Sequence, residues 1–171
     1  MSRAHRFITH GQDLVCGLVM AAMTVLAGCA NQEINRPSTV DRWSGRLALV
    51  VASDPPQQYH AAFELDGNPE SGQLDLFSPL GNMLASLQWQ PGQALLRQGA
   101  RIDAYESVNA LASAATGTAV PVRALFLWLR GSPEAVDGWV VDLSQLSVGR
   151  LHAHRQSPLP EADLRIIVDL Q

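Results

Sequence analysis

The sequence contains no lysine, and its overall charge is acidic. All 12 basic residues are arginines, and they stand against 16 acidic residues, which gives a formal net charge of −4. A domain that binds nucleic acid normally carries a basic stripe or patch, so this composition argues against that class. The absence of lysine also excludes nucleotide binding or Schiff-base chemistry that depends on a lysine ammonium group.

Motifs of common enzymes and metal proteins are lacking as well. The sequence has no phosphate-binding loop, no dinucleotide fingerprint and no serine nucleophile motif, and its carboxylates are scattered. His152 and His154 are predicted to share one face of a strand, but zinc sites use three or four ligands, so a solvated strand face is favoured. His60 is predicted to be exposed and not catalytic. We therefore expect neither an enzyme nor a bound metal or cofactor.

The first part of the sequence is typical of an export signal. Residues 1–13 are polar and carry two arginines, and residues 14–27 form an apolar run without a charge. That order is typical of a secretory signal, and a run of this length is shorter than the ~20 residues that a membrane-spanning helix needs. A buried core helix is the alternative.

The apolar run ends in a sequence that resembles the bacterial lipobox, Leu26-Ala27-Gly28-Cys29. The resemblance implies cleavage before Cys29, a diacylglycerol on its thiol and an acyl chain on its new amine. Two or three acyl chains anchor a protein durably, whereas one gives only marginal binding. Ala30 is compatible with export to the outer membrane under the sorting rules of enterobacteria. A plain signal peptide followed by a chance cysteine is the alternative.

Alternating apolar residues predict a sheet in the rest of the chain. Residues 43–51, 59–66 and 83–89 show apolar side chains at every second position, with Leu74 and Leu76 between them, and 94–97 and 101–105 are weaker candidates. Turn residues such as Asp66-Gly67-Asn68-Pro69 separate these runs. Short strands at this spacing indicate an antiparallel sheet that curls into a sandwich or a barrel.

Two helices are predicted to interrupt the strands. Ser107 is placed to cap the first helix, which ends near Thr116-Gly117. Pro121 fits the first turn of a second helix that Gly131 would end. Residues 139–143, 148–155 and 164–170 then return to strands. The expected order β-β-β-β-α-α-β-β is an α+β arrangement with helices against one face of an antiparallel sheet.

The turn between two predicted strands contains an unusual leucine. Leu80 lies between Pro79 and Gly81, and proline and glycine together favour a tight turn. A leucine at the tip of such a turn would face solvent, where it could enter a bilayer. The alternative is that Leu80 folds back into the core.

The sequence resembles the outer-membrane lipoprotein receptor family LolB. The resemblance covers residues 43–170, together with the lipobox. It is carried by Trp43-Ser-Gly-Arg-Leu-Ala-Leu, Phe63-Glu-Leu, Leu76-Phe-Ser-Pro-Leu-Gly81, Leu87-Gln-Trp89, Thr116-Gly117, Val120-Pro-Val122 and Trp128-Leu-Arg-Gly131. The region 136–171 departs from that family because it is shorter and lacks an aromatic-rich strand after Trp139.

The resemblance implies a strongly curved antiparallel sheet, an incomplete barrel, with helices covering an apolar cavity. It further implies that the protein accepts lipoproteins from the soluble periplasmic carrier LolA and inserts them into the outer membrane, at whose periplasmic face it is anchored. Leu80 takes the place of the family's membrane-delivery leucine. We expect residues 1–28 to be the signal peptide, 29–42 the lipidated tether and 43–171 the lipoprotein-binding domain, acting as a monomer.

From the apolar strand and helix positions we predict that eight residues include the lining of the acyl-chain cavity: Leu47, Leu49, Phe63, Leu74, Leu76, Leu125, Phe126 and Leu129. Which face of the first two strands points toward the cavity is left open. Two other functions also remain open. One is a lipid-binding lipoprotein of the same fold with a different cargo, and the other is a structural or assembly lipoprotein with a solid core.

Overall fold

The computed structural model describes residues 40–136 and 138–170. The predicted signal segment, Cys29 and most of the tether lie outside the described residues. The described part forms one antiparallel sheet with two α-helices, which confirms the predicted α+β class.

Six strands precede the helices. They are β1 (Asp41–Val51), β2 (Gln57–Gly67), β3 (Gly72–Phe77), β4 (Met83–Gln90), β5 (Gln93–Gln98) and β6 (Arg101–Tyr105). After helices α2 (Val108–Thr116) and α3 (Val122–Leu129) come β7 (Trp139–Asp142), β8 (Arg150–Arg155) and β9 (Ala162–Val168). The expected order of four strands, two helices and two strands was therefore wrong, because the two weaker candidates before the helices and all three runs after them pair into the sheet. A short 3-10 turn, η1 (Leu146–Val148), occupies what was predicted to be the start of β8.

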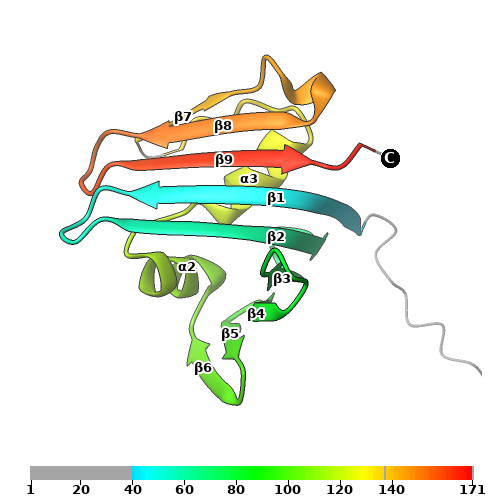
Figure 1. Ribbon diagram of the computed structural model, residues 1–171, viewed down its shortest axis with the longest axis vertical. Helices are drawn as coiled ribbons and strands as arrows, with labels where there is room; N and C mark the ends of the chain where they lie inside the picture. The colour runs from blue at the N-terminus through cyan, green and yellow to red at the C-terminus, as the bar shows by residue number, and fades with distance from the viewer. Residues whose placement is uncertain (1–39, 137, 171) are drawn as a thin grey trace, which may run out of the picture. The chain divides into compact units, whose positions relative to one another are not determined.

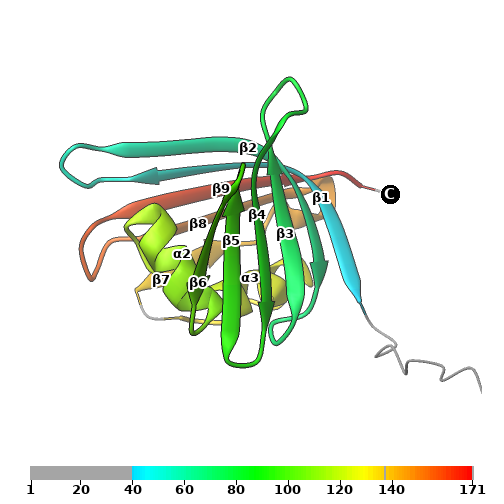
Figure 2. The same ribbon diagram turned by 90° about the horizontal axis from the view of Figure 1, so that it is seen from below.

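The nine strands lie in the order β6-β5-β4-β3-β2-β1-β9-β8-β7. Every pairing follows the chain except that of β1 with β9, where Leu47 lies opposite Ile166. Within the described residues the sheet is open, with β6 and β7 at its edges. It curves around α2 and α3, which both lie on the inner side (Figures 1 and 2).

The burial pattern shows which face of the first two strands points inward, a question that the sequence left open. In β1, Gly45, Leu49 and Val51 are buried while Arg46 is exposed, and in β2 Phe63 and Leu65 are buried while His60 and Glu64 are exposed. Because successive side chains of a strand point to opposite faces, one face of the sheet meets the helices and the other meets solvent.

The helix ends follow the predicted capping chemistry. The Ser107 hydroxyl accepts a hydrogen bond from the Ala110 N–H at 3.1 Å, and Gly117 ends α2 in the left-handed region at φ +69°. Pro121 occupies the position just before α3 and not its first turn. The helices differ in anchoring, because α3 buries five residues, Phe126 and Trp128 among them, whereas α2 buries only Leu111 and Ala112.

Candidate functional site: an apolar pocket and a protruding hairpin

An apolar pocket of about 180 Å³ lies between the inner face of the sheet and the two helices. Side chains from β1 to β5, from β9 and from both helices line it, and very little of its surface is polar. Five of the eight residues predicted for the cavity are among them: Leu47, Leu49, Leu74, Leu76 and Leu125.

The other three predicted residues lie in the core and do not line this pocket. Phe63, Phe126 and Leu129 are all buried. Phe126 is fully buried because it lies between Trp43, at 5.6 Å between ring centroids, and Trp89, at 6.1 Å. Neighbouring residues of a helix point ~100° apart, so Leu125 and Phe126 face different surroundings.

Several lining residues were not predicted for the cavity. The pocket's other apolar walls are Tyr59, Leu65, Ala85, Leu87, Trp89, Leu96, Val108, Ala112, Ala115, Val120, Val122, Leu164 and Ile166. Val108, Ala112 and Ala115 follow the spacing of one stripe of α2, so helical periodicity carries a usable signal for them. The contribution of β9 depends on its pairing with β1, which no local pattern indicates.

Two ion pairs link α3 and its C-terminal end to the sheet. Arg130, just after α3, forms an ion pair with Asp41 at the start of β1, with its Nε 2.8 Å from Oδ2. Arg123 of α3 lies 3.9 Å from Glu70 in the turn between β2 and β3. Exposed ion pairs of this kind contribute about 0–1 kcal/mol each, so they orient α3 more than they stabilise it.

Buried polar contacts hold the segments that follow the helices. The Trp139 indole N–H donates to the Ala119 carbonyl at 3.0 Å. Arg155 is buried, donates to the Thr118 hydroxyl and to the Pro160 carbonyl, and lies 5.8 Å from the centre of the Trp139 ring. These contacts tie β7 and β8 to the segment between α2 and α3.

The β3–β4 connection projects from the sheet as a hairpin (Figure 2). The Ser78 N–H donates to the Asn82 carbonyl at 2.8 Å, and the Gly81 N–H donates to the Ser78 carbonyl at 2.9 Å. At the tip, Leu80 is 88% exposed, so it does not fold back into the core. Met83 begins an alternating apolar run but is 56% exposed, because the register of β3 and β4 shifts between Leu76 and Phe77.

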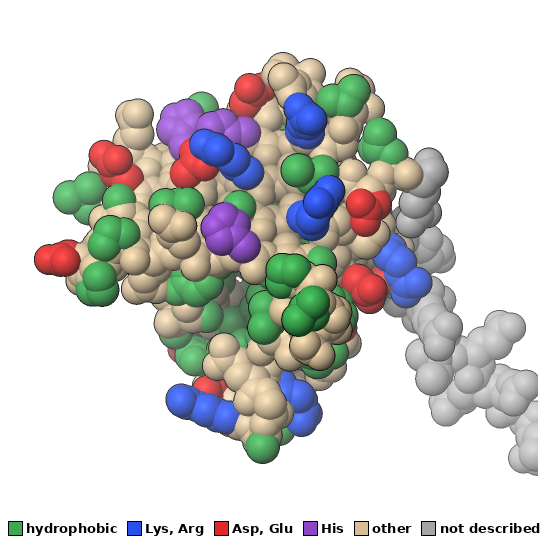
Figure 3. Space-filling model, in the orientation of Figure 1, with side chains coloured by type: hydrophobic (Ala, Val, Ile, Leu, Met, Phe, Trp, Pro, Cys, Tyr) green, Lys and Arg blue, Asp and Glu red, His purple; other side chains and the backbone are tan. Residues whose placement is uncertain are grey.

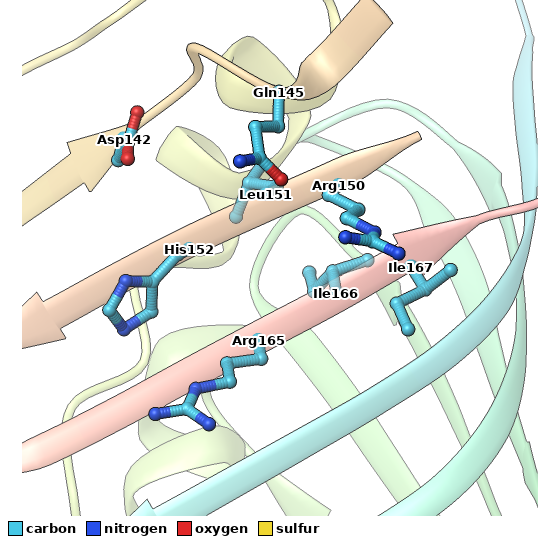
Figure 4. Close-up of a pocket in the computed structure, with 8 residues that line it drawn as sticks. All are labelled: Asp142, Gln145, Arg150, Leu151, His152, Arg165, Ile166 and Ile167. Atoms are coloured by element: carbon cyan, nitrogen blue, oxygen red, sulfur yellow. The ribbon is translucent and has the colours of Figure 1, made fainter. Parts of the chain in front are cut away.

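The outer face of the sheet carries the described histidines. His152 lies 5.9 Å from His154 between ring centroids, and its Nε2 is 2.6 Å from the Asp163 carboxylate. Figure 4 shows the side chains of His152 and Arg165 on neighbouring strands at this face. Among the described residues there is no group of three or more His, Cys, Asp or Glu that could hold a metal ion.

Two charged groups near this face have shifted pKa values. The Ser144 side chain and backbone N–H both hydrogen bond to Asp142, and they hold the pKa of that carboxyl below its usual value. The hydrogen bond and the negative charge of Asp66 raise the pKa of Arg42. Both groups are therefore charged at neutral pH.

These features define a class: an α+β protein whose open antiparallel sheet curves over two helices and leaves an apolar pocket between them. The family described as "LolB: Outer membrane lipoprotein LolB" matches residues 42–161. The chain belongs to this family of outer-membrane lipoproteins.

Individual relatives agree with this family. An outer-membrane lipoprotein LolB of Bordetella pertussis is 39% identical over 118 residues, which cover 64% of this chain and 58% of the relative. One from Chromobacterium violaceum is 33% identical over 68% of this chain and 67% of its own length. One from Shewanella woodyi is 25% identical over 82% and 69%. The chain thus spans a little under three fifths of the Bordetella protein that it matches.

The segments 40–136 and 138–170 contain no helix long and apolar enough to cross a membrane.

Proposed function

We propose that this protein receives lipoproteins from a LolA-like periplasmic carrier and inserts them into the outer membrane, to whose periplasmic face Cys29 anchors it. The observation that carries the proposal is the presence, in one domain, of an apolar pocket and a hairpin with a solvent-exposed leucine. The pocket suits acyl chains, and the hairpin suits contact with a bilayer.

An acyl chain needs such a pocket to cross water. Each CH₂ group exposed to water costs about 0.8 kcal/mol, so a lipoprotein released without cover would aggregate or return to its membrane. The lining leucines and Ile166 supply a surface that replaces the membrane interior. The sequence has no nucleotide-binding motif, so transfer runs downhill, from a weaker to a tighter site and then into the bilayer.

The pocket must enlarge to hold this cargo. Its volume of about 180 Å³ is below the ~300–1,000 Å³ of ordinary small-molecule pockets. Helix α3 is fixed by Phe126 and Trp128, whereas α2 presents small residues such as Ala112 and Ala115 to the pocket. We therefore assign the opening movement to α2.

The hairpin accounts for release of the cargo. Leu80 is exposed in a loop whose hydrogen bonds define its shape without it, so the leucine contributes nothing to the core. Burying a leucine side chain contributes about 1.5–3 kcal/mol, which becomes available when Leu80 enters a membrane. That contact would bring the pocket close to the bilayer that receives the acyl chains.

A transfer assay tests the proposal. A LolA-like carrier loaded with a lipoprotein is mixed with liposomes, with and without this protein, and the lipoprotein that floats with the liposomes is measured. We expect transfer only when this protein is present. Transfer that does not depend on it would contradict the proposal. Uptake of free lipid without uptake of lipoprotein would indicate a different cargo, and uptake of neither would favour a structural role.

A further inference from the structure

Beside the hairpin, the outer face of the sheet carries a groove with cationic walls. This groove has a volume of about 900 Å³ and is open to solvent. Arg46, His60 and Arg165 line it from three adjacent strands, and residues 77–79 and Gly81 of the hairpin close one end. Figure 3 looks onto this face, where the histidines and arginines stand out from the surrounding surface.

Strand register explains why a hollow lies among these side chains. Ala48 pairs with His60 on one side and with Arg165 on the other, so a methyl group separates the two longer residues. Arg46 in turn lies between Ala62 and Ile167. Alanines form the floor of the groove, while the imidazole and the two guanidinium groups rise from its walls.

The charge in this groove is mostly positive. Arg165 pairs with Asp163 at 2.9 Å, but within the described residues Arg46 has no carboxylate partner within 4.0 Å. Glu64 is the one carboxylate among the groove's lining residues, against two guanidinium groups. A free guanidinium beside a hollow favours an anion, and its planar fork matches the oxygens of a phosphate.

We propose that this groove binds the phosphate of an anionic lipid headgroup when the hairpin enters the bilayer. The assignment rests on the proposed function, since it requires the hairpin to reach a membrane. The groove adjoins a hairpin with exposed apolar side chains, and this supports a lipid as the source of the phosphate. The hairpin that closes the groove exposes Leu80, Met83 and, at 47%, Leu84. Apolar side chains enter the acyl region, and the long arginine side chain at the base lies at headgroup level.

The test measures insertion of the hairpin in the full, lipid-anchored chain. The chain carries a fluorophore on a cysteine introduced by Asn82→Cys and is reconstituted into vesicles that contain a quencher on the lipid tails. One set of vesicles is phosphatidylcholine alone, and the other also contains phosphatidylglycerol. We expect stronger quenching in the anionic vesicles and a decrease of that difference as salt is added.

Substitutions then locate the effect. Arg46→Gln should lower the ratio of inserted to free hairpin in anionic vesicles about five-fold, and Arg46→Lys should restore part of it, because a single cation near an anionic surface has about that effect. The matched control is Arg101→Gln, an exposed arginine of β6 that pairs with Asp103 and lies outside the groove. This control should leave the ratio unchanged.

Each remaining outcome overturns the assignment in a recognisable way. If Arg46→Gln and Arg101→Gln lowered the ratio of inserted to free hairpin equally, the effect would come from the net charge of the protein and not from a site in the groove. Equal quenching in both vesicle types would reject the headgroup site and leave the proposed function intact. Loss of the Arg46 effect in millimolar inorganic phosphate would indicate a site for soluble anions. An absence of quenching in both vesicle types would show that the hairpin does not enter the membrane. It would reject the inference and the proposed release step together.

Discussion

The ring of Phe126 meets the ring of Trp43 edge-on, with centroids 5.6 Å apart and 70° between the ring planes. Trp89 packs against the same phenylalanine at 6.1 Å and 72°. Phe126 therefore joins α3 to β1 and to β4. Aromatic pairs of this geometry contribute about 0.5–1.5 kcal/mol beyond the burial of their area.

Phe126→Ala should lower the free energy of unfolding by about 3–5 kcal/mol, because it leaves a cavity between two tryptophans. Chemical denaturation followed by tryptophan fluorescence measures this loss. Leu125→Ala is the matched control, since Leu125 is only half-buried and already faces empty space in the pocket. A loss for Leu125→Ala as large as that for Phe126→Ala would mean that α3 is not anchored by its phenylalanine.

Much of this fold could be predicted from the sequence because its strands are half-buried. Alternation in residues 43–51 and 59–66 specified the strands and the residues that share a face, though not which face lies inward, and Ser107 and Gly117 specified the ends of α2. The weaker runs, 94–97 and 101–105, were seen but left out of the expected order. The first pairs with β4 and the second pairs with the first, and this pairing stabilises them more than their own composition does.

The pocket was less predictable, because its lining depends on contacts between distant segments. Periodicity placed Phe126 on the inner side of α3 but gave no sign of the two tryptophans that surround it. Met83 continued an alternating run, yet the register shift after Leu76 moved it into solvent. Local turn chemistry placed Leu80 at the tip of a turn but left open whether it folds back into the core, and the family resemblance favoured the exposed position that the structure has.

Helix α2 should exchange its backbone amide hydrogens faster than α3 in the full chain. Only Leu111 and Ala112 are buried in α2, so its opening exposes much less apolar surface than that of α3. Hydrogen exchange followed by mass spectrometry of peptides covering the two helices measures the difference. Slower exchange in α2 would assign the opening movement to α3.

Ala115→Trp should slow the uptake of lipoprotein from the carrier several-fold. Ala115 is an exposed residue that lines the pocket, and an indole at this position would occupy part of its volume. Ala114→Trp is a close control, because Ala114 is exposed on the same helix turn but does not line the pocket. Similar effects of the two substitutions in the uptake assay would show that the tryptophan acts by perturbing α2 and not by filling the pocket.

Cys29→Ser should leave the protein unprocessed or without its lipid anchor. The serine hydroxyl cannot form the thioether to diacylglycerol that the lipobox resemblance implies. Mass spectrometry of the intact wild-type and variant chains, together with membrane fractionation, measures both consequences. A wild-type protein without lipid would refute the anchor.

Leu80→Glu should preserve uptake of lipoprotein but block its release into liposomes. A carboxylate at the hairpin tip cannot enter the acyl region without a large desolvation cost, whereas the pocket lies elsewhere and keeps its lining. The substitution should change the free energy of unfolding by less than about 0.5 kcal/mol, because the side chain is exposed. Leu159→Glu is the matched control, since Leu159 is 78% exposed in the turn between β8 and β9 and adds the same charge away from the hairpin. Normal release in Leu80→Glu, or an equal loss of release in both variants, would show that the hairpin has no specific role in membrane delivery.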